Sequence, residues 1–311
     1  MIQDLLTPAV LLGVAYSGIR LATPYLYATL GETIGQLSGV LNLGVEGMML
    51  MGAYAGFYLT FRTGNPWIGL LAAVIVGALL GLANAVITVT LKAEQGISGI
   101  GMFLFGLGMS ELLFRMSLGS VETVRGFAAL RIPWLGNLPV IGDLFFNHSL
   151  LVYAAYLLVP VVWFILNRTT WGVRIKAAGQ NPAAADALGV SIARVRYVTV
   201  TLGGVLASIA GASLSIALLN VFQQNLTSGM GFIAVALVYF GGWSPWGALA
   251  GSLLFSTVNA LQNWIQVLGI PIAPDFALML PYVLTILMLA IPFRKARQPA
   301  ALTKPFERGE G

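Results

Sequence analysis

The chain has 311 residues, of which 58% are hydrophobic and only 9% are charged. Soluble domains carry about 25% charged residues, so this composition indicates a polytopic membrane protein. The net charge of +5 does not indicate nucleic-acid binding, because the cations stand beside apolar spans. The absence of Cys excludes disulfides and thiolate metal sites, and the single histidine, His148, is expected to be structural.

Apolar stretches long enough to cross a bilayer recur along the chain and predict an all-α fold with about nine transmembrane helices, within a range of eight to ten. The spans are expected at 7–30, 38–61, 67–91, 99–118, 150–166, 197–220, 229–242, 246–264 and 276–291. Together they make a single transmembrane domain over residues 1–311.

The distribution of cations predicts the orientation of these spans. Basic residues gather in the loop 167–197 and in the tail 292–311, so both are expected to be cytoplasmic. Nine spans then put the N-terminus outside, together with the long loop 119–149. The apolar and turn residues of that loop predict an ordered segment, which caps the outer mouth, meets an external binding protein or forms a simple packed lid.

A short helix is expected in the middle of the basic loop. Asn181 is a good N-cap, Pro182 fits the first helical position, and Gly189 can end the helix in the left-handed conformation. The alanines between them leave a helix of about two turns, roughly 10 Å long, whose surface is mostly methyl groups. Another protein's backbone could approach Ala184 and Ala185 closely, although a plain connector between spans would look similar.

A second unusual segment lies near residues 31–47. Gly31, Gly35 and Gly39 recur at four-residue spacing, and four polar side chains stand among apolar neighbours, namely Glu32, Gln36, Asn42 and Glu46. One interpretation is helix packing with interhelical hydrogen bonds; the other is a broken or re-entrant helix beside a transport path. Asn84 is a further intramembrane amide that a solute could use.

Several catalytic motifs are missing from the sequence. No GxxxxGK[ST] phosphate-binding loop, HExxH or GxSxG is present, so the chain is expected neither to hydrolyse ATP nor to act as an enzyme. A membrane subunit of an ATP-driven importer, an ion-coupled secondary transporter and a passive channel remain. In the second case, Glu32, Glu46 and Glu111 would be the coupling sites.

Two stretches resemble one family of transport proteins. GQNPAAADALGV is similar to the cytoplasmic coupling loop of ABC importer permeases in the branched-chain amino acid, ribose and nucleoside group, and LSGVLNLGVEGMMLMGAYAG is similar to their early signature. The run from Gly39 to Gly47 is closest to the nucleoside-type permeases, because ribose permeases place an Asp nearer the position of Asn42.

The resemblance implies a function and a set of partners. It implies a multi-pass permease of the bacterial-type inner membrane that pairs with a second, related permease and moves a nucleoside by alternating access. Separate ATPase subunits would bind ATP and Mg, so no cofactor is expected in this chain, and an extracytoplasmic binding protein would deliver the solute. The coupling residues would be Asn181, Pro182, Ala184, Ala185 and Gly189; the path would involve Asn42, Glu46, Glu32 and Asn84.

Overall fold

Helices build almost all of the computed structural model, which describes residues 7–134, 136, 138, 140–268, 274–290 and 298–307. The first half contains α2 (Pro8–Leu37), α3 (Val45–Thr63), α4 (Pro66–Ala85) with a π-helical extension η1 (Val86–Thr90), and α5 (Gln95–Ser117). The second half contains α7 (Leu150–Arg168), α8 (Thr170–Gln180), α9 (Pro182–Ala187), α10 (Ile192–Ser213) with a π-helical extension η3 (Leu214–Leu218), α11 (Met230–Phe240), α12 (Pro245–Val267) and α13 (Pro274–Ala290).

Each of the nine predicted spans coincides with a helix, which confirms the polytopic helical fold. Five helices are long and apolar enough to cross a membrane among the described residues: α2, α4 with η1, α5, α7, and α10 with η3. Helix α11 has only 11 residues, about 16 Å, and is therefore shorter than a hydrocarbon core of about 30 Å. The number of nine complete spans stays a prediction.

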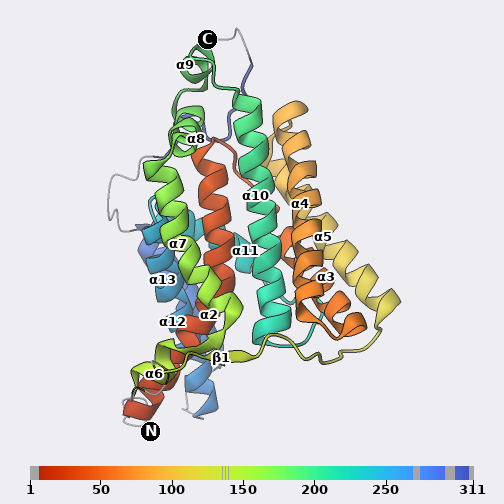
Figure 1. Ribbon diagram of the computed structural model, residues 1–311, viewed down its shortest axis with the longest axis vertical. Coiled ribbons are helices and arrows are strands. Elements are labelled where there is room, and N and C mark those ends of the chain that lie inside the picture. The colour runs from red at the N-terminus through yellow and green to blue at the C-terminus, as the bar shows by residue number, and fades with distance from the viewer. Residues whose placement is uncertain are drawn as a thin grey trace.

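Helix α10 lies at the centre of the bundle and packs against α2, α3 and α4 (Figure 1). Small residues allow these helices to approach closely. A Cβ atom on Gly211 would lie 1.8 Å from the main-chain oxygen of Met49, and one on Gly204 would lie 2.6 Å from that of Gly77. The glycines at GxxxG spacing, Gly52/Gly56 and Gly77/Gly81, likewise lie at close helix contacts, which is the usual role of this spacing in membrane spans.

The segment between α5 and α7 is ordered over its described residues, as its apolar content predicted. Strands β1 (Ala129–Arg131) and β2 (Asn147–Ser149) pair antiparallel, and the short helix α6 (Ile141–Phe145) lies between them in sequence. The main-chain nitrogens of Val124 and Phe127 donate to the oxygens of Asn220 and Ile216 at 3.0 and 2.8 Å. The segment thus crosses the end of η3 and closes this end of the bundle (Figure 1).

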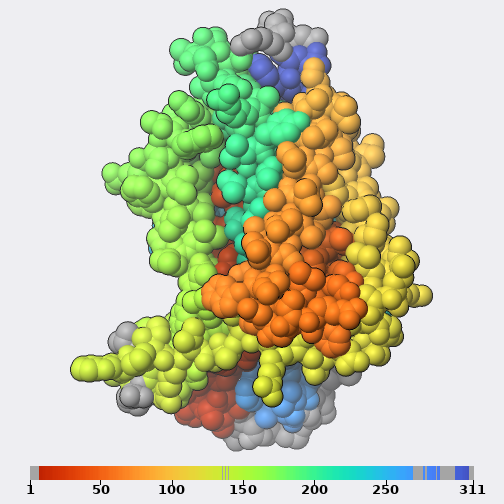
Figure 2. All heavy atoms as spheres, turned by 45° about the vertical axis from the view of Figure 1, so that its right-hand side comes forward, coloured from red at the N-terminus to blue at the C-terminus, as the bar shows by residue number. Residues whose placement is uncertain are grey.

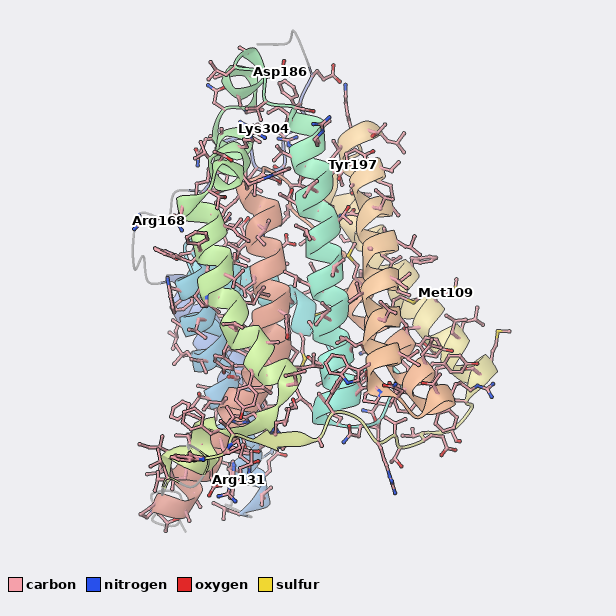
Figure 3. The ribbon with its side chains drawn as sticks, viewed as in Figure 1. Met109, Arg131, Arg168, Asp186, Tyr197 and Lys304 are labelled. Atoms are coloured by element: carbon pink, nitrogen blue, oxygen red, sulfur yellow. The ribbon has the colours of Figure 1, made fainter. Side chains whose placement is uncertain are left out.

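The basic loop 167–197 is mostly helical, and the helices that flank it extend into the range predicted for it. Helix α7 continues to Arg168, α8 follows after a single residue, and α10 already begins at Ile192. Figure 3 places Asp186 of α9 and Lys304 of the C-terminal segment at one end of the molecule, and Arg131 at the opposite end. The start of α2 lies at the same end as Arg131 (Figure 1).

The two halves of the chain share one order of elements. A long helix leads into a non-helical turn that contains Asn-Leu, at Asn42 in the first half and at Asn225 in the second. A shorter helix follows, α3 or α11, and the next helix begins with Pro-Trp, at Pro66 or Pro245. This repeat places the starts of α3 and α11 at equivalent positions of the two halves.

Candidate functional site

A buried polar network holds the turn at residues 38–44, between α2 and α3. One carboxylate oxygen of Glu32 accepts hydrogen bonds from the side-chain amide of Gln36 at 3.2 Å and from the main-chain nitrogen of Asn42 at 2.9 Å. The side-chain oxygen of Asn42 accepts from the main-chain nitrogen of Gly44 at 2.9 Å. The indole nitrogen of Trp243, in the turn before α12, donates to Gln36 at 2.8 Å. The turn is therefore tied to both halves of the chain.

This turn is the break in the helical structure that the sequence suggested, but it does not lie at the first two glycines. Gly31 and Gly35 are inside α2, which runs without interruption to Leu37. Gly31 serves close packing, because a Cβ atom there would lie 3.1 Å from the main-chain oxygen of Gly203 in α10. Gly39 lies in the turn and has a positive φ of 96°. Gly31 thus fits the packing interpretation and Gly39 lies at a break between two helices, while the transport path beside it stays a prediction.

Glu46 joins the start of α3 to the start of α11. One of its carboxylate oxygens accepts hydrogen bonds from the hydroxyl of Thr227 at 2.6 Å and from the main-chain nitrogen of Gly229 at 2.7 Å. The other accepts from the main-chain nitrogen of Gly231 at 2.6 Å. Because free N–H groups and the helix dipole favour a negative charge at a helix N-terminus, Glu46 stabilises the start of α11.

The four predicted path residues do not gather in one site. Glu32 and Asn42 meet in the turn network, whereas Glu46 faces α11. Asn84, in α4, has a buried side-chain nitrogen without a hydrogen-bond partner in the described structure. All four are at most 4% exposed. Their side chains are therefore packed inside their own chain.

The capping residues of α9 adopt the expected geometry. The side-chain oxygen of Asn181 accepts from the main-chain nitrogen of Ala184 at 3.0 Å, and Pro182 occupies the first helical position. Gly189 has a φ of 84°, and the nitrogen of Val190 donates to the oxygen of Ala185 at 3.0 Å. These bonds close the helix at its end, which confirms the predicted short helix.

The exposed surface of α9 differs from the expected one. Ala184 is exposed as predicted, but Ala185 is 4% exposed and packs in the apolar core with Val195 and Leu302, so its predicted surface position is wrong. Leu188, at the C-cap, is instead 86% exposed and was missed. The sequence contained a signal for it, because Leu188 is the one bulky apolar residue in an otherwise alanine-rich helix.

Helix α8, which precedes α9, packs against the end of α2 and the start of the turn at residues 38–44. A Cβ atom on Gly179 would lie 2.2 Å from the main-chain oxygen of Leu37, so this glycine permits direct backbone contact. The segment 298–307 joins the contact: the nitrogen of Ala301 donates to the oxygen of Gly179 at 2.9 Å, and that of Thr303 to the oxygen of Gly39 at 3.2 Å.

Arg196, in the first two turns of α10, holds these parts together. It is 2% exposed, although the sequence suggested only one of several loop cations. Its Nε donates to the main-chain oxygen of Ser38 at 3.1 Å, and its Nη1 donates to that of Lys304 at 3.0 Å. The guanidinium thus connects the turn, α10 and the C-terminal segment.

Comparisons of the sequence with known proteins identify a family of transport proteins. The family model described as branched-chain amino acid transport system / permease component matches residues 14–289. The chain is 41% identical to the putative glucose ABC transporter permease protein TsgC13 of Haloferax volcanii over 85% of this chain and 80% of that protein. It is 33% identical to the guanosine ABC transporter permease protein NupQ of Bacillus subtilis over 93% and 94%, respectively. No solved structure matches.

A third relative, the nucleoside ABC transporter permease protein NupC of Lactococcus lactis, is 34% identical over 90% of this chain and 92% of its own length. These matches favour the importer over the ion-coupled transporter that the sequence left open. The family model covers most of the chain, and each of these relatives matches more than four fifths of it. The chain therefore belongs to the branched-chain amino acid transport system permease family and is a multi-pass ABC importer permease of the simple-sugar and nucleoside type, with no enzymatic activity of its own.

Proposed function

We propose that the chain forms, with a second homologous permease, the translocation path for a nucleoside. Two of the three relatives described above are named for guanosine or nucleosides and are matched over nearly their full length, whereas the third is named for glucose. The run from Gly39 to Gly47 supports the nucleoside assignment. Its polar residues are buried, so the run supports kinship with nucleoside permeases rather than direct contact with the solute.

Helix α9 is the site at which an ATPase subunit docks. The single observation that carries this proposal is the pair formed by a well-capped short helix and the exposed Leu188 at its tip. A partner groove would receive the Leu188 side chain and the methyl surface of Ala184. Asn181, Pro182 and Gly189 fix the ends of the helix, while Ala185 anchors it to the chain's own core.

Movement of α9 reaches the interior through direct contacts. Helix α8 touches Leu37, the last residue of α2, and Gly39 in the turn, and Arg196 binds the same turn at Ser38. The turn carries Asn42, which binds Glu32, and it leads into α3, where Glu46 holds α11. We assign these residues to positioning the helices beside the path. Asn84, buried in α4, has the same role at the contact with α10.

The end that carries α9 and the segment 298–307 faces the cytoplasm, because the basic residues gather there. We therefore assign the protein to the inner membrane, with a cytoplasmic C-terminus and an external N-terminus. The segment 119–149 then faces the extracytoplasmic binding protein. ATP and Mg are bound by the ATPase subunits, in keeping with the absence of a phosphate-binding loop.

Co-expression of this chain with its ATPase, partner permease and binding protein tests the assignment. A stable assembly whose ATPase rate rises with binding protein and guanosine or adenosine, and less with glucose or ribose, supports a nucleoside importer. Stimulation by glucose alone would assign the chain to sugar uptake. Solute uptake by the chain alone, driven by a proton or sodium gradient, would refute the importer.

A further inference from the structure

An apolar groove opens between α7, α8 and α10 at the basic end of the bundle. Ile165 and Trp171 line one side, Val198 and Leu202 the other, and Ile34 of α2 contributes to the lining. Figure 2 shows this face hollowed between the green α7 and the blue-green α10, with part of the red α2 visible inside. The groove therefore fits an elongated apolar ligand.

The lining side chains remain accessible in the folded chain. Ile165, Trp171, Val198 and Leu202 are between 38% and 47% exposed, although each packs on its other side against the bundle. A ligand in the groove would cover all four at once. The apolar part of a lipid is one such ligand, and a helix of another subunit is another.

Two arginines, Arg174 and Arg194, provide positive charge at the rim of the groove. The guanidinium of Arg174 lies 6.0 Å from the centroid of the Trp171 ring. Arg194 precedes Val198 by four residues on α10 and therefore lies on the same face, one turn nearer the end of the bundle. Both are exposed, and α7, α8 and α10 contain no Asp or Glu. The rim thus complements an anion.

One tryptophan, Trp171, lines the groove, and a second, Trp163, lies on α7 near the basic end. The guanidinium of Arg174 lies over the ring of Trp171. In the same way, the guanidinium carbon of Arg168 lies over the ring of Trp163, 5.9 Å from its centroid. Tryptophan is enriched at the level of the lipid headgroups, where its ring sits in apolar surroundings and its N–H reaches water. The apolar groove therefore extends from the headgroup level into the hydrocarbon region.

We propose that this groove binds an anionic phospholipid, whose acyl chain lies against Ile165, Val198 and Leu202 and whose phosphate meets Arg174 and Arg194. Basic pockets between transmembrane helices bind anionic headgroups in this way. A zwitterionic lipid gains less from the rim, because its own cationic group opposes the two arginines. The site borders the turn at residues 38–44, because the hydroxyl of Thr199, which lines the groove, shares a hydrogen bond of 2.8 Å with that of Ser38; none of the lining residues belongs to α9.

Trp171 supplies a direct test. The full-length chain is reconstituted in vesicles of phosphatidylcholine and phosphatidylglycerol in which one lipid at a time carries brominated acyl chains, which quench nearby tryptophans. The contribution of Trp171 is the difference between the wild type and Trp171→Phe. Brominated phosphatidylglycerol is expected to quench this contribution at least twofold more than brominated phosphatidylcholine at the same mole fraction.

The double variant Arg174→Gln/Arg194→Gln is expected to lose this preference, so that both lipids quench Trp171 equally. Arg125→Gln, an exposed cation at the opposite end of the chain, is the matched control and should keep the wild-type preference. Equal quenching by the two lipids in the wild type would overturn the proposal. So would the absence of quenching, which indicates a covering protein surface, or a preference that survives the double substitution.

Discussion

The carboxylate of Glu46 accepts a hydrogen bond from the main-chain nitrogen of Gly231 at 2.6 Å, although 185 residues separate them. No side chain could replace this glycine without a shift, because a Cβ atom would lie 2.5 Å from the nitrogen of Glu46. The start of α3 in the first half and the start of α11 in the second therefore meet through one side chain and one glycine. An incoming solute would find this carboxylate already occupied by three donors.

Glu46→Gln is expected to destabilise the chain rather than only slow transport. The amide keeps one acceptor but directs an N–H₂ group at main-chain donors, and an unsatisfied buried polar group costs about 1–3 kcal/mol. Thermal unfolding of the purified variant, followed by size-exclusion chromatography, checks this. Glu122→Gln in the exposed segment after α5 serves as the control. A variant with normal stability and no uptake would instead assign Glu46 to the path.

Gly231→Ala is expected to have a larger effect than Glu46→Gln, because it moves the backbone of α11 away from α3. Gly101→Ala is the matched control: Gly101 also lies in a helix, but a Cβ atom there meets nothing within 4 Å. The thermal midpoint of the control should equal that of the wild type. Equal midpoints for the two alanine variants would show that the contact of Gly231 with Glu46 contributes little.

Local signals in the sequence predicted the helices well. Apolar length marked the spans, and the caps of α9 were correct because Asn181, Pro182 and Gly189 act within a few residues of one another. The burial of Glu32 and Asn42 could not be predicted in the same way. Gln36, which donates to Glu32, and Gly44, which donates to Asn42, are close to them in sequence. Trp243, which donates to Gln36, is 207 residues away from it, and only the fold brings the two together.

The sequence does not predict which face of a short helix is buried. A six-residue helix has no periodicity from which to tell its inner side from its outer side, so Ala184 and Ala185 were equivalent in the sequence. Arg196 was missed for a related reason. The positive-inside rule explains any cation near a span, and it does not distinguish a buried guanidinium from an exposed one such as Arg194.

Leu188→Glu is expected to abolish binding of the ATPase while leaving the chain folded. Leu188 is 86% exposed, so its replacement removes no contact of its own chain, whereas a charge would oppose entry into an apolar partner groove. Co-purification with the ATPase measures the effect. Val173→Glu, which changes another strongly exposed apolar residue on α8, is the control and should retain the ATPase. Normal co-purification of Leu188→Glu would contradict docking through α9.

Ala185→Trp should behave differently from Ala184→Trp. Ala185 is buried, so tryptophan there overpacks the core and lowers the thermal stability of the chain itself, by about 1–3 kcal/mol or more. Ala184 is exposed, so tryptophan there should leave stability unchanged and weaken ATPase binding. Loss of stability in both variants would indicate that the chain covers both faces of α9.

Arg196→Ala is expected to release the segment 298–307. The substitution removes the donors to the main-chain oxygens of Ser38 and Lys304, and hydrogen bonds from charged groups contribute about 1.5–3 kcal/mol each. Hydrogen exchange at the amides of Ala301 and Thr303 should accelerate by at least tenfold. Arg194→Ala, two residues away on the same helix and exposed, should leave this exchange unchanged. Equal protection in the two variants would exclude Arg196 as the anchor.

The buried imidazole of His148, at the end of the bundle opposite to α9, predicts that the stability of the folded chain depends on pH. Its ring is 2% exposed, stacks on Tyr16 with centroids 4.8 Å apart, and has one nitrogen 2.8 Å from the main-chain oxygen of Leu144. Burial lowers the pKa of His148 below its ordinary value of 6.5; the hydrogen bond to Leu144 opposes this shift, and the positive charge of Arg20 adds to it. The neutral imidazole is therefore the stable form in the folded chain.

Because the pKa of His148 is lower in the folded chain than in the unfolded chain, the unfolded chain binds more protons as the pH falls below 6.5. The contribution of His148 to the stability of the folded chain is therefore fully present above pH 6.5 and declines as the pH falls below that value. The thermal midpoint should fall more between about pH 7.5 and about pH 5.5 in the wild type than in His148→Phe, which keeps an aromatic ring against Tyr16 but cannot titrate. Since His148 is the only histidine, the difference between the two proteins isolates its contribution. The same pH dependence in both would show that the ring takes up its proton without disturbing the packing of β2 on α2.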